Sequence, residues 1–208
     1  MAVARRQSNA TILADGKVLV TGGTNVTGFN SVPSSDAVLA AELWDPVTEK
    51  WTTLAKMTHY RLYHSTALLL ADGRVLSTGS GSPAATGLTD DFTAEIFTPP
   101  YLFNTNGTLA TRPTITTAPT TAAYAQSFTV QTPTAASISK VMWISIGAVT
   151  HSFNENQHAL PLAFSVAGAS SITVTAPARA ALAPPGYYLL FIIDSHGVPS
   201  VGQFVRIG

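Results

Sequence analysis

The chain has 208 residues, with 11 Lys and Arg against 11 Asp and Glu, no net charge and no cysteine. Its length accommodates one large domain or two small ones, since domains usually run to about 100–200 residues. Sparse basic residues exclude the clustered positive charge with which proteins bind nucleic acids and anionic membranes, so we expect neither partner. The lack of cysteine excludes disulfides, thiolate metal sites and thiol nucleophiles.

Short β-type segments between turn residues dominate the sequence, and no long window has the period of an amphipathic helix. The pattern predicts an all-β protein. Strands are expected, in chain order, at residues 10–13, 18–21, 41–44, 65–70, 75–78, 95–97, 127–131, 141–146, 172–175, 187–194 and 203–207. The longest apolar run, at residues 187–193, is far shorter than the ~20 residues of a membrane-spanning helix.

The first half of the chain contains an internal repeat. Residues 8–19 (SNATILADGKVL) align with residues 65–76 (STALLLADGRVL), and a strand of the form Ala-Glu-apolar-aromatic closes each copy. The Asp-Gly pair in each copy predicts a hairpin with a tight two-residue turn. Glycines follow each hairpin, and a distal tryptophan, Trp51, ends the first copy. A repeat of about 50 residues with these features resembles the kelch blade of a β-propeller.

Two blades cannot close a propeller, which typically has about 4 to 8. The sequence therefore predicts about two kelch-like blades in residues 1–109, with the remaining blades supplied by the same longer chain or by a second chain. After Pro99 the pattern changes to strands with little charge between them. Residues 110–208 suit an immunoglobulin-like β-sandwich, although the Cys-Trp-Cys signature is absent.

Three residues could hold a metal ion. Tyr63 and His64 precede a strand of the second repeat, and a phenol next to an imidazole can supply oxygen and nitrogen ligands to one ion if a bulge turns both inward. His151 follows the strand that contains Trp143. Taken alone, a Tyr-His pair is more often structural and a loop histidine is more often exposed. His59, His158 and His196 are expected at the surface.

Common catalytic motifs are missing from the sequence. There is no Gly-x-Ser-x-Gly, phosphate loop, dinucleotide fingerprint or His-Glu-x-x-His. Glu155 and Asp194 are the only acids after residue 110, which leaves little basis for a glycosidase pair.

The order of motifs resembles the copper radical oxidases, the family of galactose oxidase and glyoxal oxidase. The resemblance runs over the whole chain but covers only the C-terminal portion of such an enzyme. It rests on Arg61-Leu62-Tyr63-His64-Ser65, Leu70-Ala71-Asp72-Gly73-Arg74-Val75, Phe97-Thr98-Pro99, Tyr101-Leu102, Leu109-Ala110-Thr111-Arg112-Pro113, Thr150-His151, Pro185-Gly186-Tyr187 and Gly197-Val198-Pro199-Ser200-Val201.

The resemblance implies roles for four residues. Tyr63 corresponds to the axial tyrosine of the copper site, which takes the proton of the substrate hydroxyl. His64 and His151 correspond to the two imidazole ligands, with His151 on a loop of the C-terminal domain. Phe29, in the loop after Gly22 and Gly23, resembles an aromatic residue that lines the substrate pocket. Two imidazoles and a phenol suit Cu(II).

The sequence departs from the family in one respect. The family's oxidant is a radical on a second tyrosine that is cross-linked to a cysteine, and both lie upstream of the region that this chain matches. The chain has no cysteine. Oxidation of an alcohol removes two electrons, whereas copper alone cycles by one, so we expect the chain to be inactive unless it is joined to the missing part.

Two functions remain open from the sequence. The first is the C-terminal portion of an oxidase that converts a primary alcohol, an aldehyde or a carbohydrate substrate and reduces dioxygen to hydrogen peroxide. The second is a non-catalytic kelch and sandwich module that binds carbohydrate or protein. A structural cell-wall protein is a weaker third hypothesis. Secretion is implied by the family resemblance only, because the N-terminal residues show no signal peptide.

Overall fold

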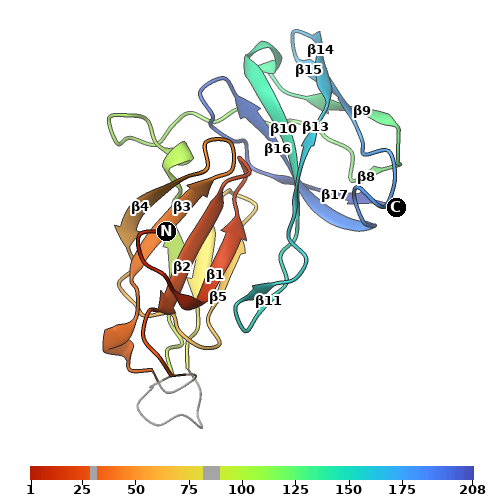
Figure 1. Cartoon of the computed structure of the whole chain (residues 1–208). Coiled ribbons are helices and arrows are strands. Elements are labelled where there is room, and N and C mark those ends of the chain that lie inside the picture. The colour runs from red at the N-terminus through yellow and green to blue at the C-terminus, as the bar shows by residue number, and fades with distance from the viewer. Residues whose placement is uncertain (29–31, 82–89) are drawn as a thin grey trace. The chain divides into compact units, whose positions relative to one another are not determined.

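A computed structural model describes residues 1–28, 32–81 and 90–208 of the chain (Figure 1). Backbone contacts divide it into two compact units. Unit 1 comprises Met1–Leu70, Arg74–Phe97 and Gly147–Gln157, and unit 2 comprises Ala71–Gly73, Thr98–Ile146 and His158–Gly208. The segment that carries His151 therefore belongs to the same unit as Tyr63 and His64. The domain boundary near residue 110 stays a prediction.

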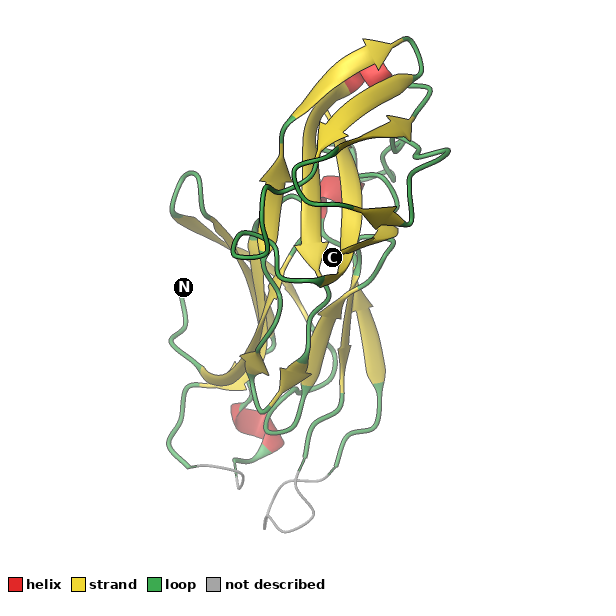
Figure 2. Cartoon of the chain, turned by 90° about the vertical axis from the view of Figure 1, so that its right-hand side faces the viewer, coloured by secondary structure: helices red, strands yellow, loops and turns green. Residues whose placement is uncertain are grey.

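The described residues are all-β, with three short 3₁₀ helices (Figure 2). This confirms that the protein is all-β, and the kelch-type blades stay a prediction. Unit 1 contains two antiparallel sheets, ordered β1-β2-β3-β4 and β5-β6-β7. The strands are β1 (Arg6–Ile12), β2 (Val18–Thr24), β3 (Ala40–Asp45), β4 (Lys50–Lys56), β5 (Thr66–Leu69), β6 (Val75–Thr78) and β7 (Ala94–Phe97), and η1 (Ser34–Asp36) is a 3₁₀ helix. A short hairpin of β11 (Val149–Thr150) and β12 (Phe153–Asn154) contacts β5 and β1.

The two repeats also share a buried ion pair. In the first, the Arg5 guanidinium pairs with Glu42 of β3, and both side chains are fully buried. In the second, Arg61 Nη2 lies 3.5 Å from Glu95 Oε2 of β7, again with the guanidinium fully buried. Burial alone raises the pKa of Glu42, but hydrogen bonds from the Ala2 backbone and from Arg5 outweigh it and lower the pKa below its usual value. Each arginine thus ties the start of its repeat to the strand that carries the paired glutamate.

The turn of the first hairpin differs from the prediction. Leu13 N donates to Lys17 O at 2.8 Å and Gly16 N donates to Leu13 O at 3.0 Å, so three residues form the loop. Gly16 has a positive φ of 92°, whereas Asp15 does not. A two-residue type I′ turn needs positive φ at both central residues, and a three-residue loop with a bulge needs it only at the glycine. The predicted two-residue turn is therefore wrong.

Unit 2 consists of a five-stranded and a three-stranded sheet around one apolar core. The sheets are ordered β13-β10-β16-β17-β8 and β14-β15-β9. Their elements are β8 (Thr121–Ala122), β9 (Ser127–Gln131), β10 (Ile138–Ser145), β13 (Ala159–Leu162), β14 (Phe164–Gly168), β15 (Ser171–Thr175), β16 (Gly186–Asp194) and β17 (Gln203–Ile207), with the 3₁₀ helices η2 (Pro100–Leu102) and η3 (Ala135–Ser137). Trp143 is fully buried and stacks between Phe128 and Tyr188, with ring centroids 5.9 and 5.3 Å away.

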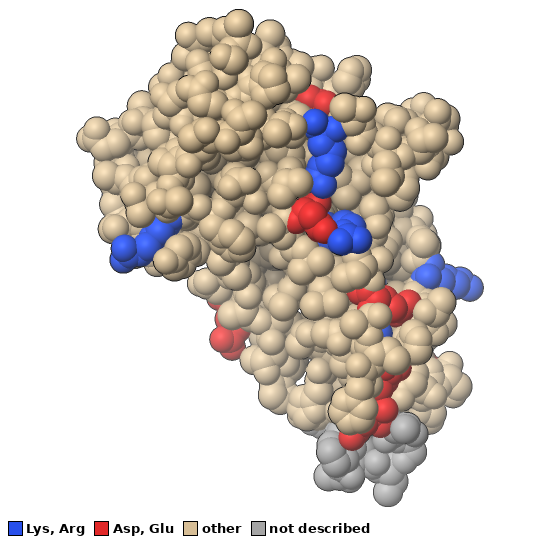
Figure 3. Space-filling model, turned by 180° about the vertical axis from the view of Figure 1, so that it is seen from behind, with Lys and Arg blue, Asp and Glu red and all other residues tan. Residues whose placement is uncertain are grey.

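Charged side chains on the face drawn in Figure 3 are few and dispersed, as the composition predicts. Among the described residues, no helix has the length and apolar character needed to cross a bilayer.

Candidate functional site

The Tyr63-His64 pair lies in a turn immediately before β5. His64 has a positive φ of 62°, and its imidazole is exposed. Gln7, at the matching position of the first repeat, has a φ of 58°. The left-handed backbone is therefore a property of the repeat, and the second copy places a histidine where the first has an amide. Leu62 is buried and Tyr63 is half-buried.

His151 lies at the tip of the β11–β12 hairpin. Thr150 pairs with Phe153, so His151 and Ser152 form a two-residue turn. Both have positive φ, at 52° and 68°. These are the signs of a type I′ turn, for which Asn, Asp and Gly are the favoured residues. The preference of the turn itself therefore does not explain why position 151 is a histidine.

The structure brings the three predicted site residues together within unit 1. The Nε2 atoms of His64 and His151 lie 3.1 Å apart, and their rings are almost perpendicular at 84°. The ring of Tyr63 packs against that of His64 at an interplanar angle of 32°, with centroids 3.9 Å apart, and its centroid lies 5.6 Å from that of His151. Residues 64 and 151 are far apart in the chain, so this proximity arises from the fold.

Hydrogen bonds fix the orientation of both imidazoles. His64 Nδ1 lies 2.9 Å from the carbonyl oxygen of Gly81, which can only accept, so Nδ1 carries the proton and Nε2 of the neutral ring has a lone pair. His151 Nδ1 lies 2.7 Å from Thr150 Oγ1. Since a hydroxyl both donates and accepts, Thr150 is compatible with either tautomer of His151.

The geometry of these donor atoms fits one metal ion. Imidazole nitrogens bind metals such as zinc at about 2.0–2.1 Å, so two adjacent nitrogen ligands of one ion lie about 2.8–3.4 Å apart, depending on the angle between them at the ion. The observed 3.1 Å falls in this range. Ligating histidines usually donate their second ring N–H to a carbonyl or a carboxylate, as His64 does. Imidazole and phenol donors suit Cu(II). Among residues 1–28, 32–81 and 90–208, no group of three His, Asp or Glu side chains could hold a metal ion.

A charged network supports the segment that carries Tyr63 and His64. Arg61 Nη1 lies 3.3 Å from Asp91 Oδ1, and His59 Nδ1 lies 3.1 Å from Asp91 Oδ2. Burial raises the pKa of Asp91, but hydrogen bonds from Thr93 and His59 and the charge of Arg61 outweigh it, so the pKa falls to about 2. Asp91 is thus ionised at neutral pH and holds Arg61 in place.

The remaining predicted residues lie elsewhere. Phe29 is outside the described residues. His196 is exposed, as expected. His158 is half-buried rather than exposed, because Nδ1 lies 2.8 Å from Ser145 Oγ and Nε2 lies 3.1 Å from the Tyr188 hydroxyl. That network belongs to unit 2 and has no place in the candidate site.

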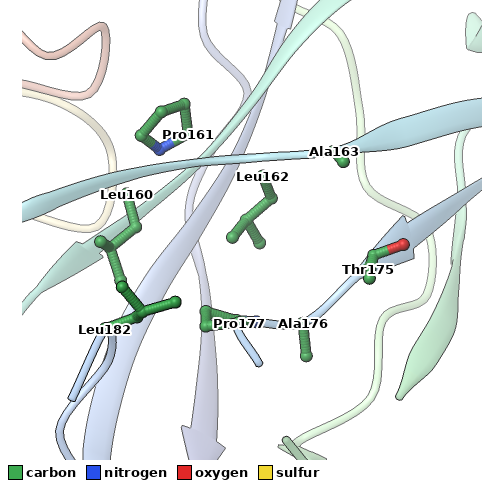
Figure 4. Close-up of a pocket in the computed structure, with 8 residues that line it drawn as sticks. All are labelled: Leu160, Pro161, Leu162, Ala163, Thr175, Ala176, Pro177 and Leu182. Atoms are coloured by element: carbon green, nitrogen blue, oxygen red, sulfur yellow. The ribbon is translucent and has the colours of Figure 1, made fainter. Parts of the chain in front are cut away.

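Unit 2 contains an apolar pocket of about 330 Å³ (Figure 4). Its lining consists of Leu160, Pro161, Leu162, Ala163, Thr175, Ala176, Pro177 and Leu182. The side chains in this lining have no titratable group, so the pocket offers no acid, base or metal ligand.

Sequence reasoning missed the residues that support the site. The Gly81 carbonyl has no side-chain signal by which it could be found. Gln157 and Asn154 lie in a polar run after His151, and both form hydrogen bonds to β1. Their amide side chains, which can pair with an open strand edge, are the only sequence feature that points to these hydrogen bonds.

Comparison with known proteins agrees with the architecture. Residues 112–207 match the family model described as "Galactose oxidase-like, Early set domain". The match covers most of unit 2 and also includes the hairpin that carries His151.

The similarity extends beyond the early set domain. The chain is 37% identical to galactose oxidase from Gibberella zeae over 98% of its length, and 32% identical to an aldehyde oxidase from Arabidopsis thaliana over 100% of its length. It spans 29% and 36% of those proteins. A fungal alcohol oxidase solved in complex with copper matches 100% of this chain and is covered to 43%, with 33% identity and a TM-score of 0.89.

Proposed function

We propose that the chain forms the C-terminal portion of a copper radical oxidase that resembles galactose oxidase and glyoxal oxidase. The observation that carries the proposal is the 3.1 Å separation of the Nε2 atoms of His64 and His151, beside the ring of Tyr63. The similarity to a copper-containing alcohol oxidase supports it. The substrate is a primary alcohol, including that of a carbohydrate, or an aldehyde, and dioxygen is reduced to hydrogen peroxide.

The residues have distinct roles in this proposal. His64 and His151 would hold Cu(II) through Nε2, and Tyr63 would be a further ligand and the base that accepts the proton of the substrate hydroxyl. Bound copper lowers the pKa of a coordinated hydroxyl. The Gly81 carbonyl keeps the proton of His64 on Nδ1, which leaves Nε2 available.

The two sheets of unit 1 are kelch-type propeller blades in this proposal, and residues 110–208 form the sandwich domain. The repeat, the meander β1-β2-β3-β4 and the buried Arg-Glu pair in each copy support the blade assignment. The remaining blades come from the same longer protein or from a second chain. We also propose that the complete protein is secreted.

In this proposal the chain by itself does not catalyse the oxidation. Oxidation of RCH₂OH to RCHO releases two electrons and two protons, which convert O₂ to H₂O₂. One copper ion accepts one of these electrons, and the family's second acceptor requires a cysteine, of which the sequence has none. We therefore propose that copper binding and catalysis are separable here.

Copper binding is the direct test. The purified chain is titrated with Cu(II) and followed by electron paramagnetic resonance, with His64→Ala, His151→Ala and the control His196→Ala. We expect one bound ion with nitrogen hyperfine structure, an affinity at least about tenfold lower in the first two variants, and no change in the control, whose histidine is exposed and distant in sequence. Absence of bound copper, or identical spectra in all four proteins, would contradict the proposal and favour the non-catalytic binding module.

A further inference from the structure

The side chain of Gln157 binds the free edge of β1. Ile12 N donates to Gln157 Oε1 at 2.7 Å, and Gln157 Nε2 donates to Ile12 O at 2.9 Å. One amide thus pairs with both backbone groups of a single residue, as a neighbouring strand would. Because β1 is an outer strand of its sheet, this edge would otherwise present unpaired groups.

Asn154 forms a second anchor on the same edge. Its Nδ2 atom donates to Ala10 O at 3.0 Å and to Gln157 Oε1 at 2.7 Å. Ala10 and Ile12 are two residues apart, so their carbonyls lie along one edge of the strand. The two amides therefore form one connected set of hydrogen bonds between the hairpin segment and β1.

The hairpin needs these anchors because it is intrinsically weak. Only two residue pairs connect β11 and β12, and a hairpin of this size is unstable in water by itself. His151 and Ser152 both adopt positive φ, which is unfavourable by roughly 1–2 kcal/mol for a residue with a side chain. The local sequence therefore does not fix the position of the His151 imidazole.

We propose that Gln157 is the positioning residue that holds the His151 imidazole opposite that of His64. It acts through the backbone of the hairpin and contacts neither imidazole in any hydrogen bond of the described residues. Its importance for copper rests on the proposed function, whereas its effect on the two imidazoles does not. Asn154 assists by bonding both Gln157 and β1.

The metal-free chain gives the first test. In histidine-labelled protein we expect a nuclear Overhauser effect between the ring protons of His64 and His151, because the two Nε2 atoms are 3.1 Å apart. Gln157→Ala and Gln157→Met should lose it, and the amide of Ile12 should exchange faster with solvent. Gln157→Met retains most of the side-chain volume and removes both hydrogen bonds. Far-UV circular dichroism checks that each variant is folded.

The control is Glu155→Gln, which changes an exposed side chain of the same segment and leaves the amides of Asn154 and Gln157 in place. It should keep both the Overhauser effect and the slow exchange. If the folded Gln157 variants also keep the contact between the imidazoles, the positioning role is overturned. If only Gln157→Ala loses its fold, Gln157→Met decides.

Copper binding is the second test, and its outcome separates the role of Gln157 from the proposed function. We expect the Gln157 variants to bind Cu(II) about 10–100-fold more weakly than the wild type, as is typical when a residue behind a metal ligand is changed. Their spectra should match that of His151→Ala. If the wild type binds no copper, the proposed oxidase site fails while the metal-free experiment still decides the role of Gln157. If copper binds and the Gln157 variants show wild-type affinity and spectra, the positioning role fails and the oxidase site stands.

Discussion

The charge on Asp91 should stabilise unit 1 at neutral pH and lose this effect in acid. Asp91 faces the fully buried guanidinium of Arg61 at 3.3 Å and the ring of His59 at 3.1 Å. Asp91→Asn keeps the size of the side chain and an oxygen that can accept the hydrogen bonds of Thr93. The substitution therefore removes the charge with little change in packing.

The pKa of Asp91 gives the magnitude. A fall from 3.8 to about 2 corresponds to about 2.4 kcal/mol, at 1.36 kcal/mol for each tenfold change in proton affinity. Solvent screening at the surface reduces this, and we expect about 1–2 kcal/mol at pH 7. Because the pKa is lowered in the folded state, the stabilisation is complete above pH 5. It falls by about half near pH 3 and vanishes below about pH 2.

Urea unfolding of the wild type and Asp91→Asn, measured from pH 7 to pH 3, tests this prediction. The difference between the two proteins cancels the contribution of Glu42, whose pKa is also lowered and which destabilises both proteins alike in acid. Glu95 shares Arg61 with Asp91, so the difference reports the charge of Asp91 together with its coupling to Glu95. We expect the difference in unfolding free energy to shrink as the pH falls. A difference that is constant over this range would show that hydrogen-bond geometry, and not charge, accounts for the effect.

Two further matched pairs test the packing by urea unfolding. Gly22→Ala should destabilise the chain by about 2–4 kcal/mol, because φ is 67° and a Cβ would lie 2.4 Å from Arg61 O, whereas Gly107→Ala, with a φ of 82° and open space, should lose only about 1–2 kcal/mol. Tyr124→Phe removes a 2.7 Å hydrogen bond to a backbone carbonyl and should lose about 1 kcal/mol. Tyr187→Phe, at a ring that is 57% exposed, should change stability by less than about 0.5 kcal/mol.

The strands that the sequence predicts are those in which alternating or continuous apolar residues face a core. β16 is an example, since residues 188–193 are all buried. The apolar pattern did not predict strands whose side chains are largely exposed or which are very short. β4 is largely exposed, β13 contains Pro161 at an outer strand, and β11 and β12 have two residues each. The Asp-Gly pairs indicated the hairpins correctly but not the length of the loops, because one positive φ satisfies a three-residue loop.

The candidate ligands came from a motif-level resemblance, since the residues alone favoured structural roles for Tyr63, His64 and His151. The structure adds the convergence of their side chains, which depends on long-range packing. It also adds Gly81 and Gln157, which act through backbone groups. One contact is a carbonyl that orients an imidazole, and the other is an amide that pairs with a strand edge. Neither requires a particular residue spacing or periodicity, so the sequence pattern does not predict them.

The left-handed backbone at the two histidines has different origins. At His64 it is shared with Gln7 of the first repeat, so the fold of the repeat requires it whatever the side chain. At His151 a turn of this type is most stable with Asn, Asp or Gly. Histidine is not among the residues that favour this turn, and its imidazole lies against that of His64. A residue that opposes its local structure, held by amides anchored to another strand, is the pattern expected where binding rather than folding determines the side chain.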